Sequence, residues 1–224
     1  DLAAQGVETV HLDYTDAASV AAAVADAQKV LLISGSEIGQ RVAQHTAVIE
    51  AAAAAVTVEQ FVYTCAPHAD TSALILAPEH KATEEALHAS GLPATILRNG
   101  WYTENYVRDA QQAIATGELA TSTGDGRVAS ASRRDFAEAA AVVLTTSGHL
   151  DATYELTGDV AWTFAEFAAT VSEISGSPVT LVPLTPEEHT ARLVGAGVDP
   201  GFAGFIVALD GNIRDGLLGE TNGE

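Results

Sequence analysis

Four short segments place small polar or aromatic side chains where a buried strand is expected to end. They are Leu12–Tyr14, Ser34–Ser36, Thr64–Ala66 and Arg98–Tyr102. In open parallel sheets, ligands bind outside the carboxyl ends of the strands. Each segment alone fits an ordinary loop, since such loops also favour Gly, Ser and Asn. Taken together, the four segments favour a crevice for a cofactor.

Single residues in these segments have more than one interpretation. Asp13 directly follows a strand-like run and has a carboxylate that can accept a hydrogen bond from an adenine amino group; a turn or helix-capping role is the simpler reading. Cys65 has no neighbour in sequence that lowers a thiol pKa, so we expect a small buried residue. Glu84 and Glu85 are adjacent and do not face one another on a helix. We therefore expect them to form a solvated face and a cap contact.

Several sites of known chemistry are not predicted. The seven histidines lack metal-ligand spacing, because His80 and His88 are too far apart for a helical pair and His45 stands alone. We predict no metal. The chain contains no G-x-G-x-x-G turn, no Tyr-x-x-x-Lys pair and no G-x-S-x-G elbow. Gly124 and Gly126 neither follow a long strand nor open a helix, so they do not replace the missing turn.

Short apolar runs alternate with alanine-rich helical stretches through the first hundred residues. We expect strands at 7–11, 29–33, 60–64 and 94–98, and helices at 16–26, 38–55 and 78–89. The alternation predicts an α/β fold with a doubly wound parallel sheet of the Rossmann type.

The regular alternation of strands and helices becomes less clear after Asn99. Helices are expected at 101–116, 134–146 and 163–175, with another opening at 185–188, and strands at 152–156 and 179–182. Two short strands should flank the turn at 124–126. Thr163 and Glu166 have the spacing of a capping box. We expect one domain, with a Rossmann core over about 1–150 and a small α+β substrate lobe over about 151–224.

Composition excludes some classes of protein. Hydrophobic residues make up 47% and the net charge is −20, so the chain is globular and would repel a nucleic acid. No apolar run is long enough to span a membrane. The single cysteine excludes an intrachain disulfide and fits a reducing cytoplasm. No feature of the sequence indicates the oligomeric state.

Several stretches are similar to one known family. They are His68–Ser72, Glu79–His80, Thr83–Glu84, Ser90–Gly91, Leu97–Tyr102, Glu104–Tyr106, Gly124–Gly126, Ala129–Ala131, Asp135, Tyr154–Leu156, Gly158–Asp159 and Ala161–Thr163. Together they resemble NmrA-like atypical short-chain dehydrogenases, nearest to the NAD(P)H:quinone oxidoreductase type 2 branch. The resemblance covers nearly the whole chain, and its most specific part is the Arg-Asn-Gly-Trp-Tyr block.

The resemblance also implies segments beyond this sequence. Members begin with a strand and a Gly-Ala-Thr-Gly-type turn that binds the pyrophosphate, followed by an arginine that selects NADPH. Both would precede Asp1, and the end after Leu218 also looks shortened; the chain has no Met. We therefore expect a parent truncated at both ends, an exposed apolar sheet edge and poor dinucleotide binding by these 224 residues alone. NADPH is the expected cofactor, with NADH possible.

Carried over residue by residue, the resemblance implies a cofactor site. Asp13 would lie near the adenine, and Ser34, Gly35 and Ser36 near the ribose and phosphate. Thr64 would follow the cofactor toward the nicotinamide. The wall between nicotinamide and substrate would comprise Asn99, Gly100, Trp101, Tyr102 and Asn105. His80 stands where many members have lysine, and packing is an equal alternative; Gly35 and Cys65 replace expected serines.

The expected activity is hydride transfer from NADPH to a quinone, with a proton from water or from a hydroxyl such as that of Tyr102. Tyr102 and His80 are the candidate catalytic residues. A dinucleotide-binding redox sensor without turnover is the alternative, and an isomerase or reductase acting on another small carbonyl compound is a third. The aromatic block at 98–105 favours the enzyme.

Overall fold

The computed structural model describes residues 2–37 and 39–222, which separate into two compact units. The first unit is built from residues up to 70, 78–98 and 139–154. The second is built from 71–77, 99–138 and 155–224. Segments of the two units thus alternate along the chain. The domain division near residue 150 stays a prediction.

A four-stranded sheet has the order β1-β2-β3-β8. Its strands are β1 (Lys29–Leu32), β2 (Gln60–Cys65), β3 (Ala94–Asn99) and β8 (Thr153–Leu156). β1, β2 and β3 are parallel, and Tyr63 is paired with Leu32 on one side and Ile96 on the other. The predicted α/β fold with a parallel sheet is confirmed.

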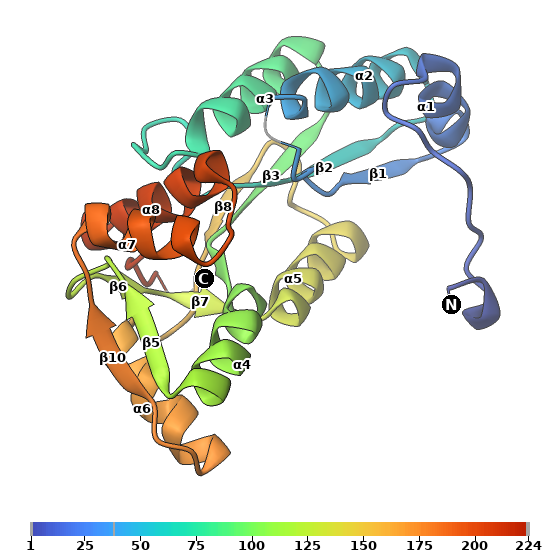
Figure 1. Ribbon diagram of the computed structural model, residues 1–224. Helices are drawn as coiled ribbons and strands as arrows, with labels where there is room; N and C mark the ends of the chain where they lie inside the picture. Colours follow the sequence, from blue (N-terminus) through green and yellow to red (C-terminus); the bar gives the residue numbers. More distant parts are fainter. Residues whose placement is uncertain (1, 38, 223–224) are drawn as a thin grey trace. The chain divides into compact units, whose positions relative to one another are not determined.

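Three helices lie along one face of β1, β2 and β3 (Figure 1). They are α1 (Ala17–Val24), α2 (Arg41–Ala54) and α3 (Ala77–Ser90). α1 begins where the Asp16 side chain accepts a hydrogen bond from the Ala18 N–H. Val20 of α1 and Ile49 of α2 are buried in the core that these helices form with the sheet.

Strand β2 is buried along its whole length, as expected of a central parallel strand covered on both faces. Its first residue, Gln60, is polar, and its amide donates to Thr95 Oγ1 and to the Val143 carbonyl oxygen. These bonds satisfy a polar group inside the core.

The predicted strand at 7–11 is wrong. The chain forms a short 3-10 helix, η1 (Ala3–Gln5), and then runs without strand structure through residue 13, mostly exposed. A strand needs a hydrogen-bonded neighbour, and the described residues supply none to this run. The predicted start of the next helix, Ile38, lies outside the described residues; α2 begins at Arg41.

The predicted helix at 101–116 is wrong over its first third. Trp101–Tyr102 form the short strand β4, Thr103–Tyr106 a 3-10 turn, η2, and only Val107–Thr116 the helix α4. β4 extends because Trp101 pairs with Ser130 and Tyr102 with Ala131. This long-range pairing overrides the local helical pattern.

Short two-stranded sheets organise the second unit. Strands β5 (Glu118–Thr121) and β10 (Thr180–Pro183) pair in parallel, and β6 (Arg127–Val128) pairs antiparallel with β9 (Trp162–Thr163). Strand β7 (Ser130–Ala131) is the partner of β4. The strands that flank residues 124–126 therefore pair with distant segments rather than with each other.

The remaining helices are α5 (Arg133–Thr145), α6 (Phe164–Ser175), α7 (Pro186–Gly195) and α8 (Pro200–Arg214). The predicted capping box of Thr163 and Glu166 is confirmed, and Thr185 and Glu188 form a second one at the start of α7. α8, which contains three glycines, was not predicted from the sequence. Asp199 caps it, and Pro200 opens it.

Among the residues that the structure describes, no helix is long and apolar enough to cross a membrane.

Two glycines of the second unit provide a matched test of packing. A Cβ at Gly158 would overlap the carbonyl oxygen of Ser130, whereas one at Gly204 in α8 would meet nothing within 4 Å. Gly158→Ala should lower the free energy of unfolding by about 2–4 kcal/mol. Gly204→Ala should raise it by roughly 0.5–1 kcal/mol through helix propensity. Urea denaturation measures both, and equal effects of the two substitutions would contradict this packing.

Candidate functional site

The loop after β1 brings together two of the predicted site residues. The Ser34 N–H donates to Thr64 Oγ1 over 2.9 Å, across the carboxyl ends of β1 and β2. Thr64 is buried and Ser34 is half-buried. Their approach follows from the parallel pairing of the two strands, which places both strand ends at one edge.

Buried side chains hold both backbone polar groups of Gly35. Its N–H donates to His45 Nε2 over 3.0 Å, and its carbonyl oxygen accepts from Arg41 Nε over 2.8 Å. Arg41 also forms a 2.7 Å ion pair with Glu79, whose other oxygen accepts from the Gly39 N–H. The loop is therefore fixed at three points by α2 and α3.

The His45 ring is held in one tautomer. Nε2 accepts from Gly35, so Nδ1 carries the proton and donates to Thr83 Oγ1 over 3.1 Å. Thr83 Oγ1 in turn donates to the Glu79 carbonyl oxygen. Burial first, and then the positive charge of Arg41, lowers the pKa of His45 to about 4. The ring is therefore neutral near neutral pH.

His80, a candidate catalytic residue, is buried beside Tyr63. The Tyr63 hydroxyl and His80 Nδ1 are 2.8 Å apart. Burial, followed by the charges of Arg41 and His45, lowers the pKa of His80 to about 3. The ring is neutral and has one nitrogen engaged by tyrosine. A catalytic role for His80 stays a prediction.

The expectation for Glu84 is wrong. Glu84 is buried, not solvated, and it forms a bidentate ion pair with Arg98 at 2.7–2.8 Å. It also accepts from Cys65 Sγ, and Arg98 pairs with Asp70 at 2.8 Å. Burial and the Glu84 charge raise the pKa of the Cys65 thiol. Cys65 is thus a buried, unreactive residue, as predicted.

Asp13 has the geometry of a turn residue. Its Oδ1 accepts from the N–H of Thr15 at 2.8 Å and from the Thr15 hydroxyl at 2.7 Å. These bonds lower the pKa of the Asp13 carboxyl. A contact with adenine stays a prediction.

A second group of predicted residues follows β3. The Asn99 amide Nδ2 donates to the Tyr102 hydroxyl over 3.3 Å, while Asn99 Oδ1 is buried and has no hydrogen-bond partner among the described residues. The Gly100 N–H donates to the Leu156 carbonyl oxygen over 2.7 Å. A Cβ at Gly100 would lie 3.0 Å from that same oxygen, so the position favours glycine.

Aromatic and cationic groups surround Tyr102. The Phe136 ring lies edge-on at 5.2 Å, and the Arg133 guanidinium lies 5.3 Å from the Tyr102 ring centroid. Arg133 also donates to Asn105 Oδ1 over 3.3 Å. Since the Tyr102 oxygen accepts from Asn99, its own hydroxyl hydrogen is free to be donated elsewhere.

The predicted cofactor residues thus form two groups, one in each compact unit. The structure brings Ser34 and Thr64 together in the first unit, and Asn99 and Tyr102 in the second.

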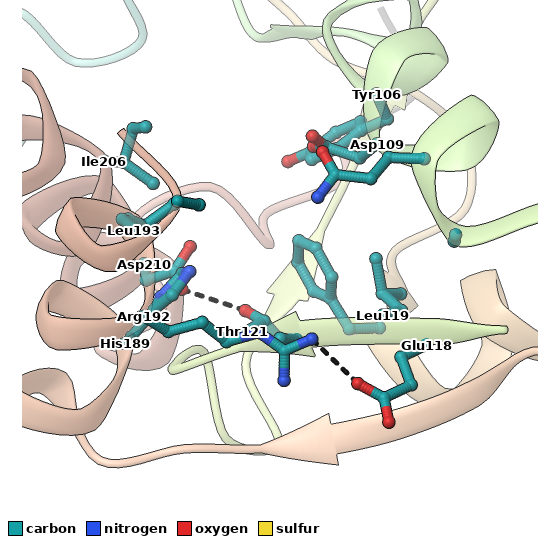
Figure 2. Close-up of a pocket in the computed structure, with 15 residues that line it drawn as sticks. Tyr106, Asp109, Glu118, Leu119, Thr121, His189, Arg192, Leu193, Ile206 and Asp210 are labelled. Carbon is teal, nitrogen blue, oxygen red and sulfur yellow. Dashed lines mark hydrogen bonds and ion pairs between the residues drawn. The ribbon is translucent and has the colours of Figure 1, made fainter. Parts of the chain in front are cut away.

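The second unit also contains a cavity that the sequence did not indicate. Its larger part has a volume of about 520 Å³ and its smaller part about 190 Å³, and both are lined by Tyr106, Asp109 and Asp210. Figure 2 shows Tyr106 and Asp109 on one side, and Leu193, Ile206 and Asp210 on the other. The lining residues come from β4, η2, α4, β5, α6, α7 and α8. No local sequence pattern indicates that these elements meet.

Beside this cavity, Ser122, His189 and Asp210 have the residue types of a hydrolase triad but not its geometry. Asp210 Oδ2 and Ser122 Oγ both lie near the same nitrogen, His189 Nδ1, at 3.0 and 3.2 Å. A relay needs the carboxylate and the hydroxyl on opposite ring nitrogens. Asp210 Oδ2 also accepts from Ser122 Oγ and Thr121 Oγ1, so the cluster is a buried structural network.

No group of three or more His, Cys, Asp or Glu within residues 2–37 and 39–222 is arranged to hold a metal ion. A dinucleotide fits the polar groups better. The unpartnered Asn99 Oδ1 suits an amide or hydroxyl donor, and the fixed loop at 34–36 presents two hydroxyl groups beside a strand end.

A parallel sheet with polar loops at the strand ends defines the class: this is a nucleotide-binding α/β protein of the Rossmann type. The chain belongs to the NAD(P)H-binding family, whose model matches residues 1–147. The predicted NmrA-like resemblance is confirmed.

The chain is similar to quinone oxidoreductase 2 of Escherichia coli strain K12, with 44% identity over 221 residues, which are 98% of this chain and 77% of that protein. The crystal structure of that enzyme with NADPH matches with a TM-score of 0.92. Triphenylmethane reductase of Citrobacter sp., solved with NADP(H), is 38% identical with a TM-score of 0.92, covering 99% of this chain and 78% of that one.

The two buried histidines of the first unit should make stability depend on pH. An unfolded histidine titrates near 6.5, whereas His45 titrates at about 4 in the folded chain. Between these values the unfolded chain binds more protons, so the free energy of unfolding falls as pH falls below about 6.5. Each such group contributes up to about 1.4 kcal/mol per pH unit.

His45→Gln should reduce this slope, measured by urea denaturation between pH 4 and 6.5. His88→Gln, on the exposed side of α3, is the matched control and should leave the slope unchanged. An unaltered slope in His45→Gln would mean that His45 is not buried in its neutral form.

Proposed function

We propose that this chain is an NAD(P)H-dependent quinone reductase. The observation that carries the proposal is the pair of predicted site groups at strand ends, above all the buried, unpartnered Asn99 Oδ1 beside Tyr102. Membership of the NAD(P)H-binding family supports the cofactor. The 44% identity to an E. coli quinone oxidoreductase supports the acceptor.

In this proposal, the loop after β1 binds the ribose and phosphate side of the cofactor. The Ser34 and Ser36 hydroxyls are the donors, and the bonds to Gly35 from His45 and Arg41 keep the loop in one conformation. A loop already fixed loses little conformational entropy when ligand binds. Thr64 lies at the same edge of the sheet and would extend the site toward the nicotinamide. Asp13 would contact the adenine.

Asn99, Gly100, Trp101, Tyr102 and Asn105 form the proposed wall at the reacting end. NAD(P)H, when bound, supplies a hydride. One hydride and one proton convert a quinone into a hydroquinone. Tyr102 is placed to donate that proton, because Asn99 occupies a lone pair of its hydroxyl oxygen and leaves the O–H hydrogen free. His80 is neutral, and one of its ring nitrogens already contacts the Tyr63 hydroxyl.

The proposed partners are small molecules. A net charge of −20 opposes binding to nucleic acid, and a single buried thiol fits a reducing compartment, so we place the protein in the cytoplasm.

The direct test is anaerobic oxidation of NADPH by this chain with a series of simple quinones, monitored by the loss of nicotinamide absorbance. NADPH is supplied at millimolar concentration, because these 224 residues alone are expected to bind a dinucleotide poorly. We expect turnover that depends on quinone. An absence of oxidation with every quinone, although NADPH binds, would contradict the proposal and favour a sensor.

Asn99→Ala should lower kcat/KM about tenfold or more, because it removes both the unpartnered acceptor and the bond to Tyr102. Tyr102→Phe should lower kcat more than it changes the KM for NADPH. Glu138→Gln is the control, since Glu138 forms only an exposed pair with Arg134. If the Asn99→Ala variant were as active as this control, Asn99 would not be part of the site.

A further inference from the structure

Helix α8 has an apolar stripe that the protein does not fully bury. The residues of the stripe follow the helical spacing i, i+3, i+4 and i+7, and they are Phe202, Phe205, Ile206 and Leu209. Such a stripe normally packs against a core. Phe202 is instead 56% exposed, and the other three residues are only half-buried. All four line the larger part of the cavity in the second unit. The stripe therefore faces space that a ligand can fill.

The same part of the cavity reaches the proposed reacting end. Trp101 and Asn105, which belong to the proposed wall between nicotinamide and acceptor, also line it. Trp101 is held in place by its pairing with Ser130. Asn105 Oδ1 accepts from Arg133 over 3.3 Å, so the Asn105 amide N–H groups can donate to a quinone carbonyl oxygen. The cavity thus offers a quinone ring both an indole surface and hydrogen-bond donors.

The cavity is larger than a quinone ring requires. Its larger part has a volume of about 520 Å³, within the range of about 300–1,000 Å³ that is typical of small-molecule sites. A single quinone ring fills only part of this volume. The smaller part, about 190 Å³, is also lined by Leu193 and Ile206 and extends the space to Leu119 and Phe164. A substituent on the ring can therefore be enclosed together with it.

The two carboxylates of the cavity do not require a charged acceptor. Asp210 Oδ2 is buried and already accepts hydrogen bonds from Thr121 and Ser122. Asp109 is exposed, and although partial enclosure raises the pKa of its carboxyl, water still reaches this group. Both carboxylates are thus accommodated by the protein and by water. What the cavity offers a substituent is the apolar surface of α8.

We propose that this cavity is the acceptor site and that the stripe on α8 selects quinones with an apolar side chain. The ring lies against Trp101 and Asn105, and the side chain runs over Phe202, Phe205 and Leu209. Each methylene group that the stripe removes from water strengthens binding by up to about fourfold. The inference rests on the proposed function for the identity of the ring, whereas the selectivity for the side chain comes from α8.

The test measures binding alone, without cofactor. The probes share a dimethoxy-methyl-benzoquinone ring that has hydrogen, a pentyl chain or an ether chain of the same length as its last substituent. Each probe is titrated into the 224-residue chain, and saturable quenching of tryptophan fluorescence reports binding, because Trp101 lines the cavity. The ether chain controls for size, since it has the length of the pentyl chain but less apolar surface.

Three variants test the contact with α8. Phe202→Ala removes a ring that is already 56% exposed, so the variant should fold. Phe205→Ala removes the neighbouring ring, whose centroid lies 6.2 Å from that of Phe202. Ile174→Ala is the matched control, because Ile174 is 81% exposed on α6 and lies outside the cavity lining.

The pentyl quinone should bind about tenfold or more tightly than the quinone without a chain, and the ether quinone should lose most of that advantage. Phe202→Ala and Phe205→Ala should each reduce the pentyl advantage about threefold or more, because they remove apolar surface from the stripe. Ile174→Ala should preserve it. Equal binding of the pentyl quinone and either other probe, an unaltered advantage in Phe202→Ala, or an equal reduction in Ile174→Ala would each overturn the inference.

Failure of this inference and failure of the proposed function are distinguishable. A chain that binds the pentyl quinone more tightly, but oxidises no NADPH with any quinone, would contradict only the proposed function. A chain that reduces quinones, but binds them equally with and without a side chain, would contradict only the inference.

Discussion

The alignment of parallel strand ends is the constraint on which the proposed cofactor site depends. β1, β2 and β3 pair in parallel, with Leu32, Tyr63 and Ile96 in register. Residues that follow these strands therefore meet at one edge of the sheet, although they are some thirty positions apart in sequence. The Ser34–Thr64 hydrogen bond is a direct consequence.

Alignment of the strands alone does not fix the conformation of a loop. Hydrogen bonds from buried side chains also hold the loop after β1. Arg41 and His45 satisfy the carbonyl and N–H of Gly35, and Glu79 connects Arg41 to Gly39. An unpaired buried charge is costly, so Arg41 and Glu79 hold each other in place. The core of the fold thereby determines the conformation of the loop proposed to bind the cofactor.

The parallel sheet and most of its elements could be predicted from the sequence, because apolar runs and helix caps are local signals. The predictions of a strand at 7–11 and of a helix start at 101 were wrong. A strand requires a hydrogen-bonded neighbour, and the local sequence does not identify that neighbour. Trp101–Tyr102 are extended by pairing with Ser130–Ala131. Glu84 was misjudged because its partner, Arg98, lies on another element.

The candidate site was predictable only in part, because many of its contacts join segments that are distant in the sequence. The resemblance indicated the strand-end residues, and Asn99 and Tyr102 do lie together. The bonds from His45 and Arg41 to Gly35 were missed, since nothing in a helical segment shows which backbone groups its side chains will reach. The cavity beside Tyr106, Asp109 and Asp210 depends on helices that meet only after folding.

Amide hydrogen exchange of this chain, with and without millimolar NADPH, tests the central claim most directly. We predict slower exchange at 34–36, at Thr64 and at 99–102 when NADPH is present. Protection confined to other segments would contradict a dinucleotide site at these strand ends.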